Sequence, residues 1–271
     1  MISLIVCTLN RVQELTEFFD SLLCQNYKNF EVILMDQNAD DRLLFIKGKY
    51  NTINVRHYKS NVKGLSVNRN LGINYAVGDI LCFPDDDCIY SRDTLEKVNE
   101  FFESTKYDIF TCSVKDILSE KQFKMPICKC DLNKYNYHNK CISIGIFIRF
   151  KNKEDVRFDE KLGVGSFFGS NEESDLISSL LNIEYKGYYD GEYYVYHPLE
   201  YSLDIQRYYK YGLGYGALMR KEILLRRKIF FIFPFVFDIL KRLFAICLPI
   251  KKRKYILYSL RGKFTGFILY K

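Results

Sequence analysis

Three consecutive carboxylates, Asp85, Asp86 and Asp87, directly follow an apolar run that ends at Phe83-Pro84. Neighbouring carboxylates repel each other, and a cation among them relieves that cost. Oxygen ligands of this kind suit Mg²⁺ or Mn²⁺ holding a diphosphate. The same acids could instead be solvated or cap the next helix, because short motifs often arise by chance. The run therefore indicates a hard-metal site for a diphosphate as one of two open alternatives.

A second acidic group lies further along the chain, at Glu172, Glu173 and Asp175. Like charges this close together raise the pKa of at least one carboxyl group, which suits a general base near neutral pH. Acidic residues at the start of a helix can also do no more than complement the helix dipole. Both interpretations stay open from the residues alone.

The elements that must position these groups alternate along the first hundred residues. Apolar runs predict strands at residues 2–7, 30–35, 53–57 and 80–83. Helices are expected from the capping box of Asn10 and Gln13 onward and over residues 66–76. Strands that alternate with helices imply a parallel sheet wound in the Rossmann manner, whose carboxyl edge binds ligands. Asn10, Asp36 and Asp85 all follow strands at that edge.

The pattern is looser after a helix that we expect to start near Ser91. Strands are predicted at residues 109–114 and 142–150, and a domain change near residue 100. A helix is predicted from Pro234 to Cys247, with Pro249 stopping it. Its polar residues form one narrow stripe beside a broad apolar face.

Charge is unevenly spread along the chain. The net charge is +7, yet the part from Lys221 onward has thirteen Lys/Arg against two acids, a net +11, which leaves about −4 for the rest. Phe, Ile and Leu crowd between these basic clusters, so an anionic membrane surface is the favoured partner of the tail and nucleic acid is not. A helix that packs into a core is the alternative.

Cysteine usage points to a reducing compartment. The nine cysteines include no C-x-x-C pair, and most lie in apolar runs. Residues 2–7 are too short and lack the basic start of a signal peptide, so a cytoplasmic protein is expected. Cys128, Cys130, His138 and Cys141 have the composition of a zinc site, but their C-x-C spacing is unusual for one.

Four segments resemble family-2 glycosyltransferases with the GT-A fold, in the same order and at similar separations. They are residues 4–11, 36–39, 61–72 and 78–87. The last two are the most specific. Asp36 matches the carboxylate that in this family reads uracil or another nucleobase. The usual Asp-Asp-Gly-Ser is replaced here by Asp36-Gln37-Asn38-Ala39, which leaves the identity of the nucleobase open. Residues 207–216 are similar to a tyrosine- and glycine-rich motif of capsule and O-antigen transferases, whose glycines would let the backbone approach a ligand or membrane.

The resemblance implies a role for each matching residue. Asp85 and Asp87 form the D-x-D pair, and His197 completes a metal site for Mn²⁺ or Mg²⁺ with them. Glu173, or its neighbour Glu172, is the catalytic base. The nucleotide-sugar site comprises Thr8, Asn10, Arg11, Asp36, Lys63, Arg69, Asp85 and Asp86, in which Arg69 pairs with the diphosphate. A surface helix arginine is the alternative for Arg69.

We therefore expect an α/β protein with a GT-A fold, a mostly parallel Rossmann-like sheet flanked by helices, and a C-terminal amphipathic helical tail. Residues 1–100 would bind the nucleotide sugar, favouring a UDP-sugar, residues 101–220 the acceptor, and residues 221–271 the membrane. The implied activity is inverting transfer to a saccharide acceptor that is expected to be lipid-linked, in surface polysaccharide synthesis at the inner face of the cell membrane.

Two other functions stay open. Nucleotidyl transfer uses similar metal-bound diphosphates, but the first turn lacks the glycine-rich phosphate loop expected there. A non-catalytic membrane-associated scaffold derived from a transferase would require that the carboxylates bind neither metal nor nucleotide. Metal and nucleotide binding distinguish both from glycosyl transfer.

Overall fold

The computed structural model describes residues 1–198, 204–248 and 252–271 of the chain. The backbone forms two compact units: Met1–Phe158 with Leu176–Glu200, and Asp159–Asp175 with Tyr201–Lys271. These two units are defined by contacts within the backbone, whereas the predicted division near residues 100 and 220 separates the parts by the ligand that each is expected to bind. That functional division stays a prediction.

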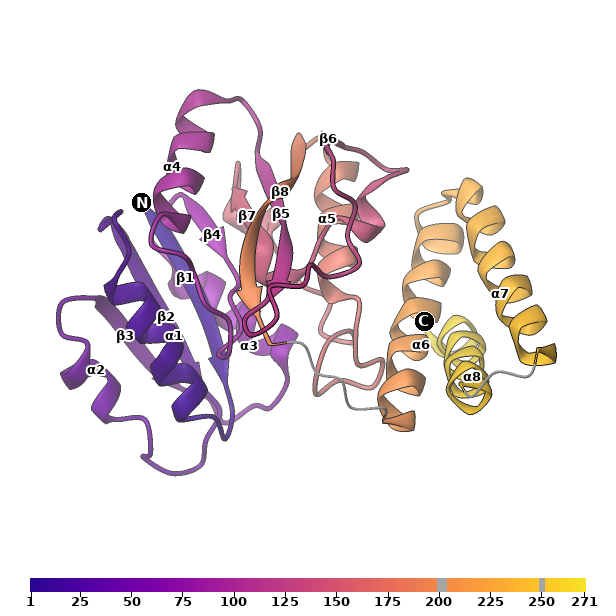
Figure 1. Cartoon of the computed structure of the whole chain (residues 1–271), viewed down its shortest axis with the longest axis horizontal. Coiled ribbons are helices and arrows are strands. Elements are labelled where there is room, and N and C mark those ends of the chain that lie inside the picture. The colour runs from indigo at the N-terminus through magenta and orange to yellow at the C-terminus, as the bar shows by residue number, and fades with distance from the viewer. Residues whose placement is uncertain (199–203, 249–251) are drawn as a thin grey trace. The chain divides into compact units, whose positions relative to one another are not determined.

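The first unit is built on one eight-stranded sheet with the order β3-β2-β1-β4-β7-β5-β8-β6. Its strands are β1 (Ile2–Thr8), β2 (Phe30–Asp36), β3 (Asn54–Lys59), β4 (Ile80–Cys82), β5 (Ile109–Asp116), β6 (Lys129–Leu132), β7 (Ile146–Arg149) and β8 (Gly187–His197). The β3-β2-β1-β4 block is parallel, as is the β5-β8 pair, while β7 and β6 pair antiparallel with their neighbours. Figure 1 shows this sheet with its helices, which confirms the predicted α/β class.

Helices accompany the sheet, and the sequence predicted all of them except the short one at Phe45–Lys49. They are α1 (Gln13–Leu23), α2 (Phe45–Lys49), α3 (Leu65–Tyr75), α4 (Thr94–Ser104) and α5 (Glu172–Asn182), the last of which begins in the second unit. Apolar side chains on one face of α1, such as Phe18 and Phe19, pack with the fully buried residues of β1 and β2 in one core. The predicted capping box is wrong: Val12 occupies the N-cap without a side-chain bond. Asn10 instead takes φ 62 and turns the chain away from the strand.

The later strands are the least like the prediction. Of the predicted strand 142–150, only β7 is extended, because residues 143–145 form a 3₁₀ turn. Strand β8 is long and rich in tyrosine, and its pairing with β5 carries a register shift between Cys112 and Ser113. It ends at His197, at the same edge of the sheet as the end of β5.

The second unit is helical. It contains α6 (Ile205–Arg220), a π-helical turn at Lys221–Leu225, a 3₁₀ turn at Ile229–Phe231, α7 (Ile232–Cys247) and α8 (Arg253–Leu269). The helix predicted at 234–247 is present, and its predicted stop at Pro249 lies outside the described residues. None of the helices in the described ranges has both the length and the apolarity needed to cross a membrane.

Glycines let α6 and α8 pack backbone against backbone. A Cβ on Gly212 would lie 2.2 Å from the Ser259 carbonyl oxygen, and one on Gly216 would lie 2.0 Å from that of Lys263. Gly262 and Gly266 on α8 approach α6 equally closely. The glycines that were predicted to approach a ligand or membrane therefore approach a neighbouring helix, and α6 runs through them unbroken.

Candidate nucleotide and metal site

Two isolated bridges place the acidic loop of Asp85 to Asp87 beside the ends of β1 and β8. Cys7 of β1 pairs in parallel with Asp85, and Ile89 pairs antiparallel with Tyr196. The second bridge brings the end of β8 to the loop, so the Nε2 atom of His197 lies 3.1 Å from Asp87 Oδ1 and 3.8 Å from Asp85 Oδ2. The structure thus brings together the three predicted metal ligands.

The donor set fits a hard divalent cation. One ligand atom from each of Asp85, Asp87 and His197 lies within 4.8 Å of the others, and no other such trio of acidic, histidine or cysteine side chains occurs in the described ranges. Two carboxylates and an imidazole are suitable ligands for Mn²⁺ or Mg²⁺. The Nδ1 atom of His197 lies 2.8 Å from the carbonyl oxygen of Pro198, which directs Nε2 at the carboxylates.

Burial and neighbouring charges shift the pKa values of two carboxyl groups in the acidic loop. Burial, with a further contribution from the charges of its neighbours, raises the pKa of Asp86 to about 6 despite its bond with Thr8 and the charge of Arg11. Burial alone would raise the pKa of Asp87, but the His197 bond and charge together with Arg11 lower it. Burial of Asp86 and the pairing of Asp87 with His197 and Arg11 are thus the main causes of these opposed shifts, and repulsion among the carboxylates contributes less.

Two arginines approach the acidic loop from different elements. Arg11 follows β1, and its Nη1 atom lies 3.0 Å from Asp86 and also contacts Asp87. Arg69 of α3 is 1% exposed, and its Nη2 lies 2.9 Å from Asp85 Oδ1. Its guanidinium also lies over the Phe158 ring. The alternative of a surface helix arginine is therefore wrong for Arg69, since it is buried against the acidic loop.

Asp36 at the end of β2 is buried within a shell of donors. Its Oδ1 accepts hydrogen bonds from the backbone N–H and the side-chain amide of Asn38, and its Oδ2 lies 3.0 Å from His57 Nε2 and 3.1 Å from Lys59 Nζ. Burial would raise the pKa of Asp36, but the bonds from Asn38, His57 and Lys59 lower it. A carboxylate has about four acceptor positions, so Asp36 has little capacity left to accept hydrogen bonds from the nucleobase of a donor.

The sequence-based prediction missed His57 and Lys59. Their signal was available, because residues two apart on a strand share a face. In the parallel pairing of β2 with β3, Asp36 is in register with Lys59 and Leu34 with His57. The two side chains therefore reach the same carboxylate from the neighbouring strand.

A cavity of about 360 Å³ opens beside this end of β2 and β3. Its lining is polar and comprises Gln37, Asn38, Ala39, Asp41, Lys59, Ser60, Asn61 and Lys63. Thus Lys63 lies at the cavity. Asn10 touches its lining through a 2.7 Å bond from its backbone N–H to Asn38 Oδ1. Thr8 lies at the end of β1, with its hydroxyl 3.4 Å from the Arg11 carbonyl oxygen. The nucleotide-site residues predicted from the sequence therefore fall either at this cavity or at the acidic loop.

The predicted base residues lie at the start of α5. Glu172 and Glu173 occupy its first turn, after Asn171 with φ 68, and Glu172 is buried. Their role as catalytic base stays a prediction.

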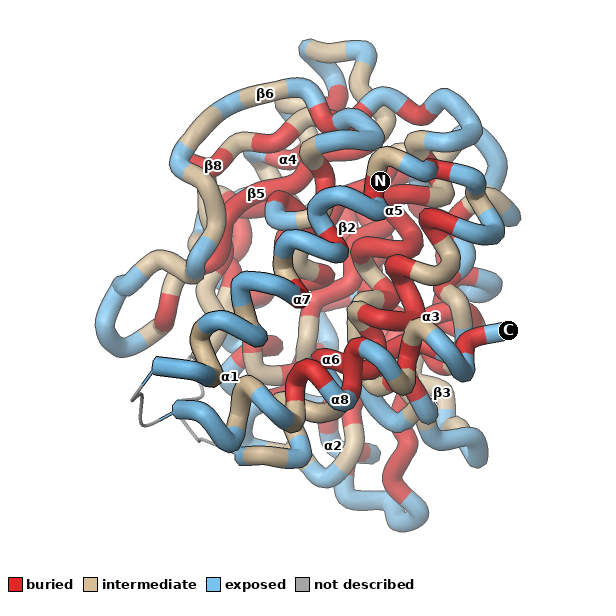
Figure 2. The backbone as a smooth tube through the Cα atoms, turned by 90° about the vertical axis from the view of Figure 1, so that its right-hand side faces the viewer, coloured by how far each residue is buried: buried red, intermediate tan, exposed pale blue. Residues whose placement is uncertain are grey.

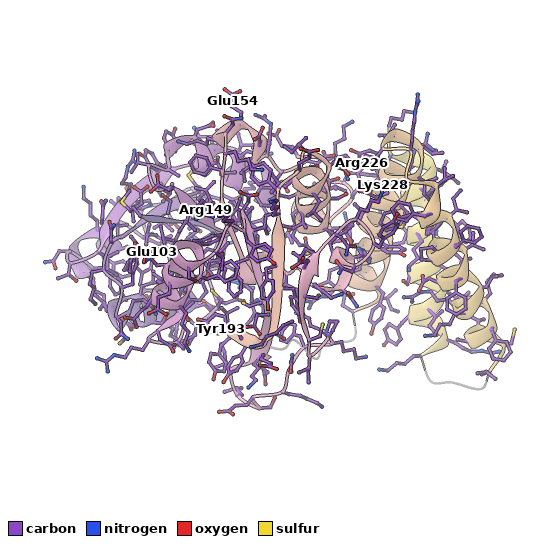
Figure 3. The ribbon with its side chains drawn as sticks, turned by 90° about the horizontal axis from the view of Figure 1, so that it is seen from above. Glu103, Arg149, Glu154, Tyr193, Arg226 and Lys228 are labelled. Atoms are coloured by element: carbon purple, nitrogen blue, oxygen red, sulfur yellow. The ribbon has the colours of Figure 1, made fainter. Side chains whose placement is uncertain are left out.

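Salt bridges hold this helix start within the second unit. Lys221 Nζ lies 2.6 Å from Asp159 and 2.7 Å from Asp175, so one ammonium joins both ends of the segment 159–175. Arg226 adds a 2.8 Å contact to Asp175, and Arg226 and Lys228, labelled in Figure 3, both pair with the fully buried Glu222. The π-helical turn at Lys221–Leu225 carries Lys221 and Glu222, and Arg226 and Lys228 follow it.

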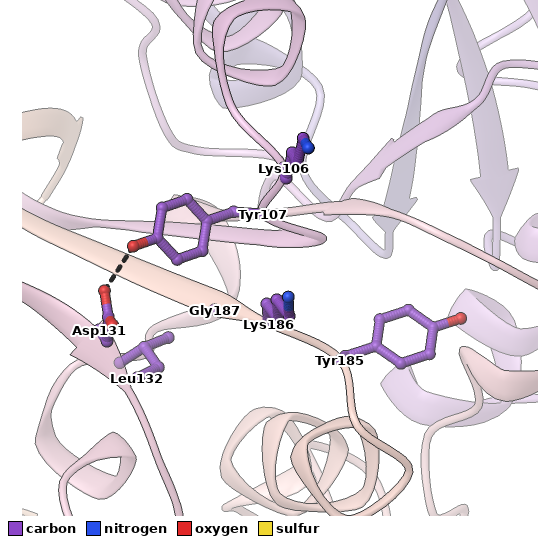
Figure 4. Close-up of a pocket in the computed structure, with 7 residues that line it drawn as sticks. All are labelled: Lys106, Tyr107, Asp131, Leu132, Tyr185, Lys186 and Gly187. Atoms are coloured by element: carbon purple, nitrogen blue, oxygen red, sulfur yellow. Dashed lines mark hydrogen bonds between the residues drawn. The ribbon is translucent and has the colours of Figure 1, made fainter.

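A second cavity of about 490 Å³ lies at the other end of β5 and β8 (Figure 4). It is lined by Lys106, Tyr107, Asp131, Leu132, Tyr185, Lys186 and Gly187. The Tyr107 hydroxyl donates to Asp131, and the Tyr185 hydroxyl donates to Asp155. None of the residues predicted from the sequence lies in this lining.

The four residues considered for zinc do not converge. Cys128, Cys130, His138 and Cys141 form no metal-binding group in the described part of the chain. The Cys141 thiol is buried and donates to the Tyr137 carbonyl oxygen instead.

The sequence profile of the family described as "Glycosyl transferase family 2" matches residues 3–154, more than half of the chain. The chain belongs to this family. The matched residues contain β1 to β7, Asp36, Arg69 and the acidic loop. The family-2 membership predicted from the resemblance is therefore confirmed.

Two curated relatives illustrate the range of the family-2 match. An uncharacterized glycosyltransferase of Rickettsia felis is 32% identical over 123 residues, covering 44% of this chain and 20% of the relative. The minor teichoic acid biosynthesis protein GgaB of Bacillus subtilis is 27% identical over 164 residues, covering 56% of this chain and 18% of the relative. The chain thus spans about a fifth of the length of these relatives.

Solved structures share the fold. S. aureus TarS 1-349 in complex with UDP-GlcNAc gives a TM-score of 0.67 at 17% identity, over 99% of this chain and 73% of that chain. The mannosyltransferase PcManGT from Pyrobaculum calidifontis, in complex with GDP-Man and Mn²⁺, gives 0.65 at 11% identity, over 97% and 86%. At these identities the likeness establishes the predicted GT-A fold and nothing about ligands.

Proposed function

We propose that this family-2 chain is an inverting glycosyltransferase that moves a sugar from a nucleotide diphosphate to a saccharide acceptor. The observation that carries the proposal is the convergence of Asp85, Asp87 and His197 beside Arg69. Acidic and cationic groups together suit a diphosphate. The carboxylates would hold a divalent metal ion that neutralises the charge of the diphosphate, and guanidinium groups pair directly with the diphosphate oxygens.

Asp85, Asp87 and His197 would hold a Mn²⁺ or Mg²⁺ ion. Such an ion supplies charge neutralisation for the leaving diphosphate. Arg69, buried at the acidic loop, is suited to orient the diphosphate. The Mn²⁺ in the complex of PcManGT is consistent with the use of a divalent ion here.

Glu173, or Glu172 beside it, is the proposed base. The acceptor hydroxyl gives its proton to the carboxylate, and its oxygen forms the new bond at the sugar C1 while the bond from C1 to the diphosphate oxygen breaks. Attack from the face opposite the diphosphate inverts the configuration in a single displacement. Glu172 and Glu173 in the first turn of α5 are anchored through the ion pairs of Asp175.

The base of the donor is proposed to enter the 360 Å³ cavity beside β2 and β3. Lys63 offers donors there, which suit the carbonyl oxygens of uracil, while the Lys59 ammonium is bonded to Asp36, Asn38 and Asp40. A UDP-sugar is therefore the favoured donor, in keeping with the UDP-GlcNAc complex of TarS. Asp36 would act by holding Asn38, His57 and Lys59 in place.

The acceptor is proposed to be a lipid-linked saccharide in surface polysaccharide synthesis, at the inner face of the cell membrane. The name of GgaB, a minor teichoic acid biosynthesis protein, supports this class of product. The basic and apolar character of residues 221–271 supports a membrane surface as partner.

Calorimetric titration with UDP-, GDP- and dTDP-sugars, with and without Mn²⁺, tests the donor site. We expect metal-dependent binding of one nucleotide, weakened about a hundredfold or more in Asp87→Ala, since a carboxylate ligand is lost. Asp79→Ala is the matched control, because Asp79 is exposed and, within the described ranges, its side chain pairs only with the N-terminal amine.

Two outcomes would contradict the transferase. Absence of nucleotide binding under every condition would favour a scaffold derived from a transferase. Tight binding of nucleoside triphosphates with release of pyrophosphate would favour nucleotidyl transfer.

A further inference from the structure

Helix α7 exposes most of its apolar side chains, whereas its charged residues Asp238 and Arg242 are half-buried. Phe233 is 80% exposed, and Phe237 and Phe244 are each 68% exposed. The other exposed apolar residues of α7 and its C-cap are Ile232, Val236, Leu240, Leu243 and Leu248. On a period of 3.6 residues these positions cover about half of the helix circumference. Figure 2 shows α7 as largely exposed.

The polar stripe of α7 faces its own unit. Arg242 Nε lies 3.0 Å from Asp238 Oδ2, and the buried Lys263 of α8 also pairs with Asp238. Phe235 and Ile239 are buried next to this seam, and the Phe235 ring stacks on Phe267 of α8. The seam fixes the rotation of α7, so its apolar half cannot turn inward without breaking these ion pairs.

The exposed charged side chains of the described residues after Lys221 are all positive. Among described residues after Lys221, the exposed ionisable side chains are Arg227, Lys241, Lys252, Arg253, Lys254, Arg261 and Lys271. The carboxylates of the same stretch, Glu222 and Asp238, are buried or half-buried and paired. Cations therefore precede α7, border its apolar face at Lys241 and follow it.

We infer that α7 is an interfacial membrane anchor that lies in the plane of an anionic bilayer, with Phe233, Phe237 and Phe244 among the acyl chains. A face rich in Phe and Leu with Lys and Arg around it binds at the headgroup level. The helix has 16 residues, which at 1.5 Å per residue is about 24 Å and shorter than the roughly 30 Å hydrocarbon core.

The charges favour lipid over a second copy of the chain. A symmetric pairing through α7 would bring together two surfaces whose exposed charges, such as Arg227 and Lys241, have the same sign. Anionic headgroups instead neutralise each of these cations. The inference rests on the membrane partner of the proposed function and assigns the surface that meets it.

The test is flotation of the full chain with unilamellar vesicles of phosphatidylcholine alone or mixed equally with phosphatidylglycerol. We expect binding to the anionic vesicles, weakened by salt, and at least about tenfold weaker partition for Phe233→Ser/Phe237→Ser/Phe244→Ser. The control is Leu118→Ser/Ile127→Ser, which removes exposed apolar side chains of the first unit, 93% and 73% exposed, and should float as the parent does.

Donor titration and circular dichroism of the same samples separate the two proposals. Because the substituted phenylalanines are exposed, the triple variant should keep its fold and bind the nucleotide sugar as the parent does. A parent that binds donor but stays free of vesicles would overturn the anchor and leave the transferase standing. So would a triple variant that floats unchanged, or a parent dimer that the triple variant turns into a monomer, which would show that a second copy covers α7.

Discussion

Phenylalanine and glycine take different places in the two units. In the first unit Phe18, Phe19 and Phe147 are fully buried in the core that joins the sheet to its helices. In the second unit, Phe233 and Phe237 lie in solvent, while glycines occupy the contact between α6 and α8. The first unit buries large aromatic side chains between its sheet and helices, whereas the second packs two helix backbones directly against each other beside a smaller apolar cluster.

The difference shows how a small helical unit can keep an apolar surface free. Backbone contact through Gly216 and Gly266 joins α6 to α8 without large apolar side chains at the points of closest approach. Buried ion pairs around Asp175 and Glu222 hold the segment 159–175 and the turn after α6 together in the same unit. The apolar residues of α7 are then available for a partner. Three predictions test this comparison, from the largest expected effect to the smallest.

Substituting Gly216 by Ala should be the most damaging single change. The new Cβ would lie 2.0 Å from a backbone oxygen of α8, so the helices must separate, at a cost of about 3 kcal/mol or more in the free energy of unfolding. Gly48→Ala on α2 is the control, because its Cβ meets nothing within 4 Å and should stabilise by about 0.5–1 kcal/mol. Urea unfolding followed by circular dichroism measures both. Equal effects would mean that α6 and α8 do not depend on close contact.

Lys221→Met should cost about 2–3 kcal/mol in the free energy of unfolding, because it leaves Asp159 and Asp175 short of a partner in a largely buried place. The matched variant is Lys97→Met, which breaks an exposed i,i+4 pair with Asp93 and should cost less than about 0.5 kcal/mol. Thermal unfolding of both proteins gives the comparison. A loss for Lys221→Met as small as for Lys97→Met would show that the network around Asp175 is not stabilising.

Replacing the buried Asp36 of the first unit should give the smallest change in the free energy of unfolding, and this change should depend on pH. Asn38, His57 and Lys59 hold the pKa of Asp36 below its usual value, so its stabilisation is present above about pH 4 and is lost as the pH falls through the folded value. Asp36→Asn should therefore be less stable than the parent by about 1–2 kcal/mol at pH 7. The gap should narrow toward pH 3.5. The exposed Asp79→Asn serves as control in urea unfolding at both pH values, and a gap that stays constant would contradict the pKa direction.

Much of the first unit could be predicted from local signals. Apolar runs placed β1 and β2 within a residue of their observed ends, because each is buried along its whole length and so is apolar almost throughout. The acidic loop was recognised for the same local reason, as a charged run after a strand. Short β6 was not separable from loop, and the 3₁₀ turn before β7 was predicted as part of a strand, since neither is long enough to show a period of its own.

The sequence by itself determined the family, the parallel half of the sheet, the carboxylates at its edge and the amphipathic character of α7. It did not determine that Asp36 is enclosed by His57 and Lys59, that Arg69 is buried against Asp85, or that Gly216 meets α8. Nor could it decide which half of α7 is covered. Those features depend on register and on contacts between segments far apart in the chain, which only the tertiary structure fixes, whereas strand and helix periodicity is written in neighbouring residues.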